Sequence, residues 1–418
     1  MKLRLCLFLA AISVALAAAP AWTARRPRYG GTLRVEVGAS VASLDPDVAA
    51  ATPEEAATKT EIDALIYDHR NPDGTFAGEA GSGPFRVTTW DAGKRATLTA
   101  NDGFREGRPF VDAIEITMGR AAHDRLLDLE LSKADFAEVP PQEARLASER
   151  GVRVSVSQPD ELLALFFVSE SAAGTTGGQQ PRAALVPKNA KDIGQALSLA
   201  IDRVAIVNFI LQKTGEPAGG LLPQWSSGTA FLFPAVSPTE TDLAHAKELW
   251  KQIAPSPKLL LGYDSADSLE QSVAERIAVN AREAGIVIRA QGLPNAGARD
   301  ARGAAQIGTG DLQLVRWRMA SPQPASALRS FLARIYQGPL AGVERGAFPE
   351  AASAEDIYNQ QRAVLSTYRV VPLVWLPQVY GLSARVRDWK TPGPGQGWPL
   401  ADLWLDAGAA TTTGGGPQ

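Results

Sequence analysis

A stretch in the second half of the chain reads as a strand, a helix and a second strand, and this order constrains the fold most. The apolar run LLLGYD (259–264) is typical of a buried strand. Ser268 and Gln271 have the spacing of a capping box, and Gly285 stands where a helix ends before the second strand, IVIRA (286–290). Four apolar residues recur at helical spacing between them: Leu269, Val273, Ile277 and Ala281. Such a unit pairs its strands in parallel through a right-handed crossover.

Other segments extend this pattern over the chain. DLQLV (311–315) predicts a third buried strand, and residues 241–254 predict an amphipathic helix. Residues 192–211 read as two helices that meet at Asp202, whose carboxylate can cap the second. The paired carboxylates Asp264 and Asp267 are expected to cap the helix after them rather than to perform acid–base chemistry. The first half is more sheet-like, with short runs such as GTLRVEV, GPFRVTTWD and RATLTA. We therefore expect an α/β protein.

Length and composition point to a folded protein of two lobes. The 418 residues are too many for one ordinary hydrophobic core. The apolar share of 45% and the charged share of 21% are those of a globular protein. Lys and Arg number 42 against 45 Asp and Glu, with no basic run, so nucleic acid is not an expected partner.

The N-terminus resembles an export signal. Lys2 and Arg4 precede an apolar run that ends at Pro20 and is followed by small residues suited to cleavage. We expect a signal peptide at residues 1–21 and a periplasmic mature protein. The single cysteine, Cys6, lies inside this leader rather than after it, so a lipoprotein is not expected. The mature chain would contain no thiol.

Catalytic motifs are not found in the sequence. The three histidines, His69, His123 and His245, are far apart and share no metal-ligand spacing. The chain contains no G-x-S-x-G nucleophile turn and no P-loop, and its glycine-rich segment at residues 78–85 leads into a strand rather than a helix. We expect no catalytic residue, no metal and no cofactor, and therefore a protein that binds a ligand between its lobes.

Several segments, in order, resemble the family 5 extracellular solute-binding proteins of ABC transporters, a group with dipeptide-, oligopeptide- and nickel-binding members. The GSGPF segment keeps the family's order of Gly-Pro-Phe, Trp, Gly, Asn, Gly-x-Pro and Asp. The matching segments are YGGTLRVEV (29–37), SLDP (43–46), GSGPFRVTTWDAGKRATLTANDGFREGRPFVDAIEI (81–116), QALSLAIDRVAIVNFILQKTGEPAGGLLPQ (195–224), DLQLVRW (311–317) and VVPLVWLPQ (370–378). The resemblance implies a hinged, two-lobe periplasmic-binding-protein-like fold of type II, with mixed sheets flanked by helices.

The resemblance also implies the division of the chain. Lobe I would be discontinuous, with residues 28–164 and 376–408, and lobe II would comprise residues 165–375. Apart from the resemblance, the low-complexity composition of the C-terminus predicts a disordered tail at 409–418. The family carries a longer segment between its LDP and GPF motifs, including an accessory subdomain that helps line the ligand chamber. Here only residues 47–82 remain, so the subdomain is expected to be largely missing.

The implied function is capture of a peptide-like or other small solute and its delivery to the membrane permease of an ABC transporter. The chain is expected to act as a monomer and without chemical change to the ligand. The alternative is a scaffold that has lost transport and serves as a periplasmic sensor or interaction protein. The shortened first lobe is the feature that favours this alternative.

The expected ligand site lies where residues 314–326 leave a strand for a Pro-rich loop. Relatives usually carry acidic residues after this strand, whereas here Arg316 and Arg318 flank Trp317. We expect the two arginines on one face of the strand and Trp317 on the other, with Trp317 as a ligand wall and the arginines favouring an anionic or uncharged ligand. Further candidates lie at or after the return to lobe I: Trp375, Tyr380 and Trp398. Alternatively, Trp317 packs in the core and the arginines pair with Asp311 or Glu344.

Overall fold

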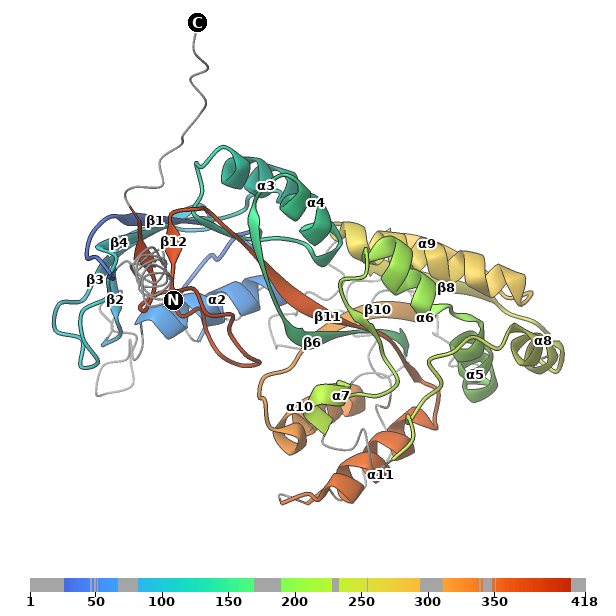
Figure 1. Ribbon diagram of the computed structural model, residues 1–418. Coiled ribbons are helices and arrows are strands. Elements are labelled where there is room, and N and C mark those ends of the chain that lie inside the picture. The colour runs from blue at the N-terminus through green and yellow to red at the C-terminus, as the bar shows by residue number, and fades with distance from the viewer. Residues whose placement is uncertain are drawn as a thin grey trace, which may run out of the picture.

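The computed structural model shows two lobes side by side, connected by two long strands (Figure 1). We call the parts lobe I and lobe II with the predicted boundaries, which stay a prediction. The predicted leader (1–21) and tail (409–418) lie outside the described residues. The structure describes residues 26–45, 47–48, 50, 52–66, 82–168, 189–227, 233–253, 255–293, 311–337, 340, 348–349 and 351–406.

Lobe I is a sheet with helices on both faces. Its elements are β1 (Thr32–Glu36), α2 (Pro53–Ile66), β2 (Phe85–Asp91), β3 (Arg95–Ala100), β4 (Ala113–Thr117), α3 (Ala122–Glu130), β5 (Phe136–Glu138), η1 (Pro141–Glu143), α4 (Ala144–Glu149), β12 (Val386–Arg387) and β13 (Trp404–Leu405). Strand β1 pairs in parallel with β4 and β5, while β3 is antiparallel to β2 and β4. The three strands predicted in the first half are thus confirmed. Helix α2 buries Ile62 and Leu65 against one face, and α3 and α4 cover the other.

Lobe II contains the strand–helix–strand unit. Its elements are α5 (Ala190–Ala200), α6 (Arg203–Ala205), η3 (Ile206–Ile210), β7 (Glu216–Pro217), α7 (Gln224–Ser227), α8 (Leu243–Lys251), β8 (Lys258–Asp264), α9 (Ser268–Glu283), β9 (Val287–Leu293), β10 (Leu312–Arg318), α10 (Pro324–Gln337) and α11 (Ala354–Leu365). Strand β8 pairs in parallel with both β9 and β10, as the sequence predicts. Helices α5, α8 and α9 cover one face of the sheet, and α10 and α11 cover the other (Figure 1).

The start of α9 differs from the predicted capping box. The N-cap residue is Asp267, whose carboxylate accepts hydrogen bonds from the backbone N–H groups of Leu269 and Glu270 at 2.8 and 3.1 Å. The capping box of Ser268 and Gln271 is therefore wrong, because Ser268 is already the first helical residue. The capping role predicted for Asp267 is confirmed. Gly285 has φ of +86°, the left-handed conformation expected after the helix.

Strands β6 (Arg153–Phe167) and β11 (Val370–Leu382) pair in antiparallel and run through both lobes (Figure 1). They join the two sheets, so the described strands form one sheet in the order β2-β3-β4-β1-β5-β11-β6-β10-β8-β9, with β7 paired to β11. Pro159 faces Pro377 where the strands cross between lobes, and β11 has irregular register on both sides of Pro377. Because proline has no N–H group, the backbone ladder is interrupted at this crossing.

Helix α5 and residues 203–210 meet at a bend of 51°. Asp202 caps the second segment by accepting a hydrogen bond from Ala205 N at 2.8 Å, which confirms the predicted junction. No single helix among the described residues is long and apolar enough to cross a membrane. Taken together, α5 and residues 203–210 have the length and apolar composition of a membrane-spanning helix, but they are bent at their junction.

Arg203 lies at this bend and is fully buried. Its guanidinium donates to Pro372 O on β11 at 2.9 Å, to Ser198 O at 2.8 Å and to Ser198 Oγ at 3.1 Å. Burial lowers the pKa of Arg203 to about 10, so the side chain is still charged at neutral pH. It therefore connects the end of α5 to a crossing strand by hydrogen bonds to uncharged acceptors.

We predict that Arg203→Met lowers the free energy of unfolding by about 2–4 kcal/mol, because several buried acceptors lose their donor. Urea unfolding followed by circular dichroism measures this change. The matched control is Arg105→Met, since the Arg105 side chain is 83% exposed. Equal midpoints for Arg203→Met and the parent protein would contradict this role.

Candidate functional site

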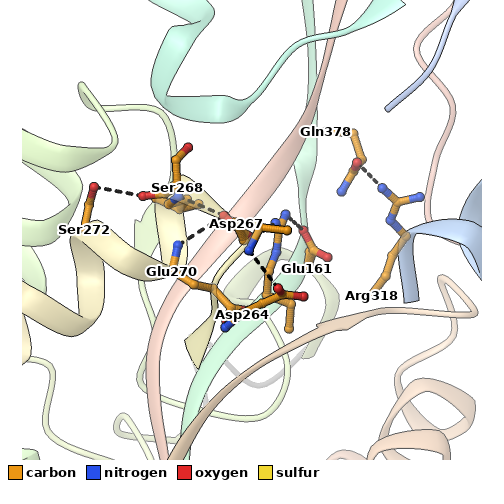
Figure 2. Close-up of polar contacts among 11 residues, drawn as sticks. Glu161, Asp264, Asp267, Ser268, Glu270, Ser272, Arg318 and Gln378 are labelled. Atoms are coloured by element: carbon orange, nitrogen blue, oxygen red, sulfur yellow. Dashed lines mark hydrogen bonds and ion pairs between the residues drawn. The ribbon is translucent and has the colours of Figure 1, made fainter. Parts of the chain in front are cut away.

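The candidate site lies where the carboxyl ends of β8 and β10 meet the crossing strands. In open sheets with parallel strands, ligands bind beyond the carboxyl ends of the strands. Strand β10 pairs with β6 over its whole length, so Arg316 stands opposite Leu163 and Arg318 opposite Glu161. Figure 2 shows the start of α9, Glu161, and the contact of Arg318 with Gln378 in this region.

Arg316 binds two carboxylates from different elements. Its Nη1 donates to Asp267 Oδ2 at 2.6 Å, and its Nη2 donates to Glu161 Oε2 at 2.5 Å. Burial alone would lower the pKa of Arg316, but Glu161 and Asp267 raise it well above its ordinary value. The pair Arg316–Asp267 thus connects β10 to the start of α9, and Arg316–Glu161 connects β10 to β6.

Glu270 lies behind this ion pair and is buried. Its Oε2 accepts a hydrogen bond from Asp264 N at 2.8 Å at the end of β8. Burial raises the pKa of Glu270 to about 8, and the nearby Asp267 carboxylate adds to this shift. The carboxyl end of β8 is therefore rich in acidic groups.

Arg318 occupies the neighbouring position, closer to lobe I. It donates a hydrogen bond to the Gln378 side chain on β11 (Figure 2). Gln378 in turn donates to Asp160 Oδ1 at 3.3 Å. Burial would lower the pKa of Arg318, yet the carboxylates of Glu161, Asp160 and Glu138 raise it. Burial raises the pKa of Asp160 to about 6, although Arg318 opposes this shift.

Helix α2 brings carboxylates of lobe I to the same region. Glu54 interacts electrostatically with Arg316 and Glu61 with Arg318. The Glu61 side chain is buried and accepts a hydrogen bond from Trp398 N at 2.6 Å. Burial raises the pKa of Glu61 to about 8, against the effect of Arg318. Both lobes therefore contribute charged groups to one cluster around the two arginines.

The predicted aromatic candidates lie in the two cores beside this cluster. Trp317 is 6% exposed and contacts Phe166 and Phe331, with ring centroids 4.5 and 5.6 Å away. Trp375 lies in the same core of lobe II. Trp317 therefore packs in the core, which was the alternative stated from the sequence. Its side chain lies on the face of β10 opposite the arginines, as expected.

Tyr380 and Trp398 belong to the core of lobe I instead. Both rings lie around Phe136, with centroids 5.6 and 5.2 Å from it. Burial raises the pKa of the Tyr380 hydroxyl, and Arg318 opposes this shift, so the hydroxyl lies near the charged cluster. The Nε1 atoms of Trp398 and Trp375 are buried with no hydrogen-bond partner in the described structure.

One predicted partner of the arginines differs from the structure, and the other is not tested by it. The Asp311 carboxylate accepts from Leu260 N at 2.8 Å, and the partners of Arg316 are Glu161 and Asp267. Pairing with Asp311 is therefore wrong, and Glu344 lies outside the described residues. Sequence reasoning also missed Glu61, whose helix belongs to the segment interpreted as the remnant of a lost subdomain. The sequence offered no specific signal for it, because only the structure shows that several charged residues of α2 are buried.

Among the described residues, no group of three His, Cys, Asp or Glu side chains is arranged to hold a metal ion. Two hollows of about 430 and 460 Å³ are lined by residues of lobe I, and none of these residues belongs to the cluster. The first is lined by Tyr29, Gly30, Arg108 and Asp112, and the second by Phe110, Asp388, Trp389, Lys390 and Asp402. Neither contains a predicted site residue, so we place the candidate site at the charged cluster on chemical grounds.

Comparisons with known proteins agree with this architecture. Residues 33–336 match the sequence model of the bacterial extracellular solute-binding proteins, family 5 Middle. The chain is 24% identical over 256 residues to the probable D,D-dipeptide-binding periplasmic protein DdpA of Escherichia coli, covering 60% of this chain and 46% of DdpA. It thus spans about half the length of this curated relative.

Two solved structures share the fold. DppA from Helicobacter pylori, in complex with peptide STSA, superposes with a TM-score of 0.66 at 13% identity, covering 91% of this chain and 99% of DppA. The oligopeptide-binding protein AppA from Bacillus subtilis, in complex with a nonapeptide, gives 0.64 at 12% identity, covering 91% of this chain and 100% of AppA. These matches confirm the predicted periplasmic-binding-protein-like fold.

We predict that Glu61→Gln flattens the pH dependence of stability. A carboxyl whose pKa is raised in the folded state contributes stability below its unfolded pKa, and this contribution is lost as the pH rises through about 8. Between pH 5 and 8 the parent protein should lose up to about 1.4 kcal/mol per pH unit more than the variant. Urea unfolding at several pH values measures the slope. Glu106→Gln, at an exposed side chain, is the control and should keep the parent slope.

Proposed function

Because this chain belongs to the bacterial extracellular solute-binding proteins of family 5, we propose that it binds a peptide-like or other small solute and delivers it to the permease of an ABC transporter. The predicted signal peptide supports a place outside the cytoplasm, and DdpA is by name a periplasmic protein. The ligand would be held without chemical change, by a monomer whose lobes close around it.

The observation that carries this proposal is the cluster in which both lobes and both crossing strands take part. Arg316 and Arg318 come from lobe II, Glu54 and Glu61 from α2 of lobe I, and Gln378 from β11. A ligand in contact with this cluster would touch groups that move relative to one another when the lobes move. Such a site can convert ligand binding into a change of shape.

The charges of the cluster support a ligand with a positively charged group. Both arginines already interact with carboxylates of this chain, and acidic groups outnumber them. The acidic groups near the two arginines are Glu54, Glu138, Asp160, Glu161 and Asp267, together with Glu61, which its pKa of about 8 leaves mostly protonated and so uncharged at neutral pH. We therefore propose an ammonium or guanidinium group on the ligand, in place of the anionic or uncharged ligand that the sequence indicated.

Three of the predicted site residues place a polar group at the cluster: the guanidinium groups of Arg316 and Arg318 and the hydroxyl of Tyr380. We propose these as ligand-binding residues. Trp398 is proposed to lie beside them, because its backbone N–H donates a hydrogen bond to Glu61. Trp317 and Trp375 are proposed to act through packing, since their rings support strands β10 and β11 from the core of lobe II.

We predict that short peptides with a free ammonium group raise the melting temperature, and that their N-acetylated forms do so much less. A ligand at a hundred times its Kd would add about 2.7 kcal/mol to the free energy of unfolding. Thermal shift with a panel of matched peptides measures this, and native mass spectrometry of protein from its own host identifies the bound molecule. No shift with any peptide, sugar or organic cation would contradict the proposal and favour the sensor alternative.

We further predict that Glu54→Gln weakens binding of the free peptide by about two- to fivefold, as expected for an exposed charge pair. Isothermal titration calorimetry with the peptide found in the panel measures this change. The same substitution at Glu106, on the outer surface of lobe I, is the control and should leave Kd unchanged. Equal affinities for the parent protein and Glu54→Gln would remove Glu54 from the site.

A further inference from the structure

The loop of residues 391–399 (TPGPGQGWP) contacts both lobes, although both of its ends belong to lobe I. The short strands β12 and β13 flank this loop and pair with each other. Arg387 and Asp406 add an ion pair at 3.2 Å across the same base. The loop itself contains a tight turn, in which Gly393 N donates to the Gln396 side chain and Gln396 N donates to Gly393 O, both at 3.0 Å.

One side of the loop lies on helix α2. Trp398 N donates to Glu61 Oε2 at 2.6 Å. Gly397 approaches the helix so closely that an added Cβ would lie 2.5 Å from the Cβ of Ala64. The position therefore excludes any larger residue unless the loop or the helix shifts.

The other side of the loop lies on lobe II. A Cβ added at Gly395 would lie 2.8 Å from the carbonyl carbon of Ala320, closer still to its oxygen, and 3.3 Å from Ser321 N. The peptide between Ala320 and Ser321 follows strand β10 directly, two residues beyond Arg318. Gly395 thus makes a backbone-to-backbone contact between the lobes, beside the charged cluster.

We propose that residues 391–399 are a latch that holds the two lobes in the arrangement seen here and separates from the Ala320–Ser321 peptide when they open. The contact uses glycine and backbone atoms, so it can form and break without rotation of side chains. The crossing strands lack backbone N–H groups at Pro159 and Pro377, which leaves the lobes free to move about that point. The loop supplies a non-covalent connection besides the two crossing strands, and its strength would contribute to how often the ligand-free protein opens.

This inference rests on the movement of the lobes that the proposed function requires, and its test uses no ligand. Spin labels would be placed on Cys6→Ser protein at Lys94→Cys in lobe I and Lys247→Cys in lobe II, both exposed positions. Pulsed electron paramagnetic resonance then measures the distribution of distances between the lobes. Ligand binding is measured separately by thermal shift, so the failure of one idea is distinct from the failure of the other.

We predict that Gly395→Ala raises the population with long distances by about tenfold or more, because the added methyl group overlaps Ala320. The matched control is Gly151→Ala. Gly151 has φ of +84° against +71° for Gly395, but a Cβ there meets nothing within 4 Å. The control therefore carries similar backbone strain without the clash and should keep the parent distribution. An unchanged distribution in folded Gly395→Ala would overturn the proposal.

A second variant decides the matter if Gly395→Ala does not fold. Gln396→Ala changes an exposed side chain and removes its hydrogen bond to Gly393 N, which loosens the turn without adding bulk. The latch predicts a shift toward long distances in this variant, smaller than that of Gly395→Ala. Parent-like distances in Gln396→Ala would then reject the latch.

Discussion

The antiparallel pairing of β6 with β11 is the interaction on which the rest of the structure depends. Strand β6 passes from lobe I to lobe II and β11 returns from lobe II to lobe I, and together they join two smaller sheets into one. The end of β6 contributes alternate residues to the two cores that flank the lobe II sheet, with Leu163 and Leu165 on one face and Leu162 and Ala164 on the other. The same strands thus contribute to both of these cores and determine where the lobes meet. The facing prolines interrupt the backbone ladder only at the crossing between lobe I and lobe II.

The charged cluster follows from this arrangement. Asp160 and Glu161 come immediately after Pro159 on β6, and Gln378 follows Pro377 on β11, so polar side chains occupy the crossing itself. Strand β10 adds its arginines there because it pairs with β6 along its length. Helix α2 supplies carboxylates from lobe I. Burial costs charged groups their hydration, and the close pairing of Arg316 with Glu161 and Asp267 offsets that cost.

The parts of the site that depend on neighbouring residues could be predicted from the sequence, and the parts that depend on contacts between distant segments could not. That Arg316 and Arg318 share a face opposite Trp317 follows from the alternation of side chains along a strand, and the structure has this geometry. The burial of Trp317 depends on helices α10 and α11, which no local pattern in β10 specifies. The partners of Arg316 lie 155 and 49 residues away, at Glu161 and Asp267. Sequence spacing carries no information on such contacts.

The sequence by itself determined the α/β class, the parallel strand–helix–strand unit of lobe II, the junction at Asp202 and the family. These rest on periodicity, capping and turn residues, which act over a few neighbouring positions, and on the order of motifs along the chain. Only the tertiary structure decided that Asp267, besides its predicted role as a helix cap, is a partner of Arg316. It also decided that Glu61 lies near Arg318 and that Gly395 contacts Ala320. Those contacts exist because long-range strand pairing brings distant segments together, and a one-dimensional pattern does not specify which segments meet.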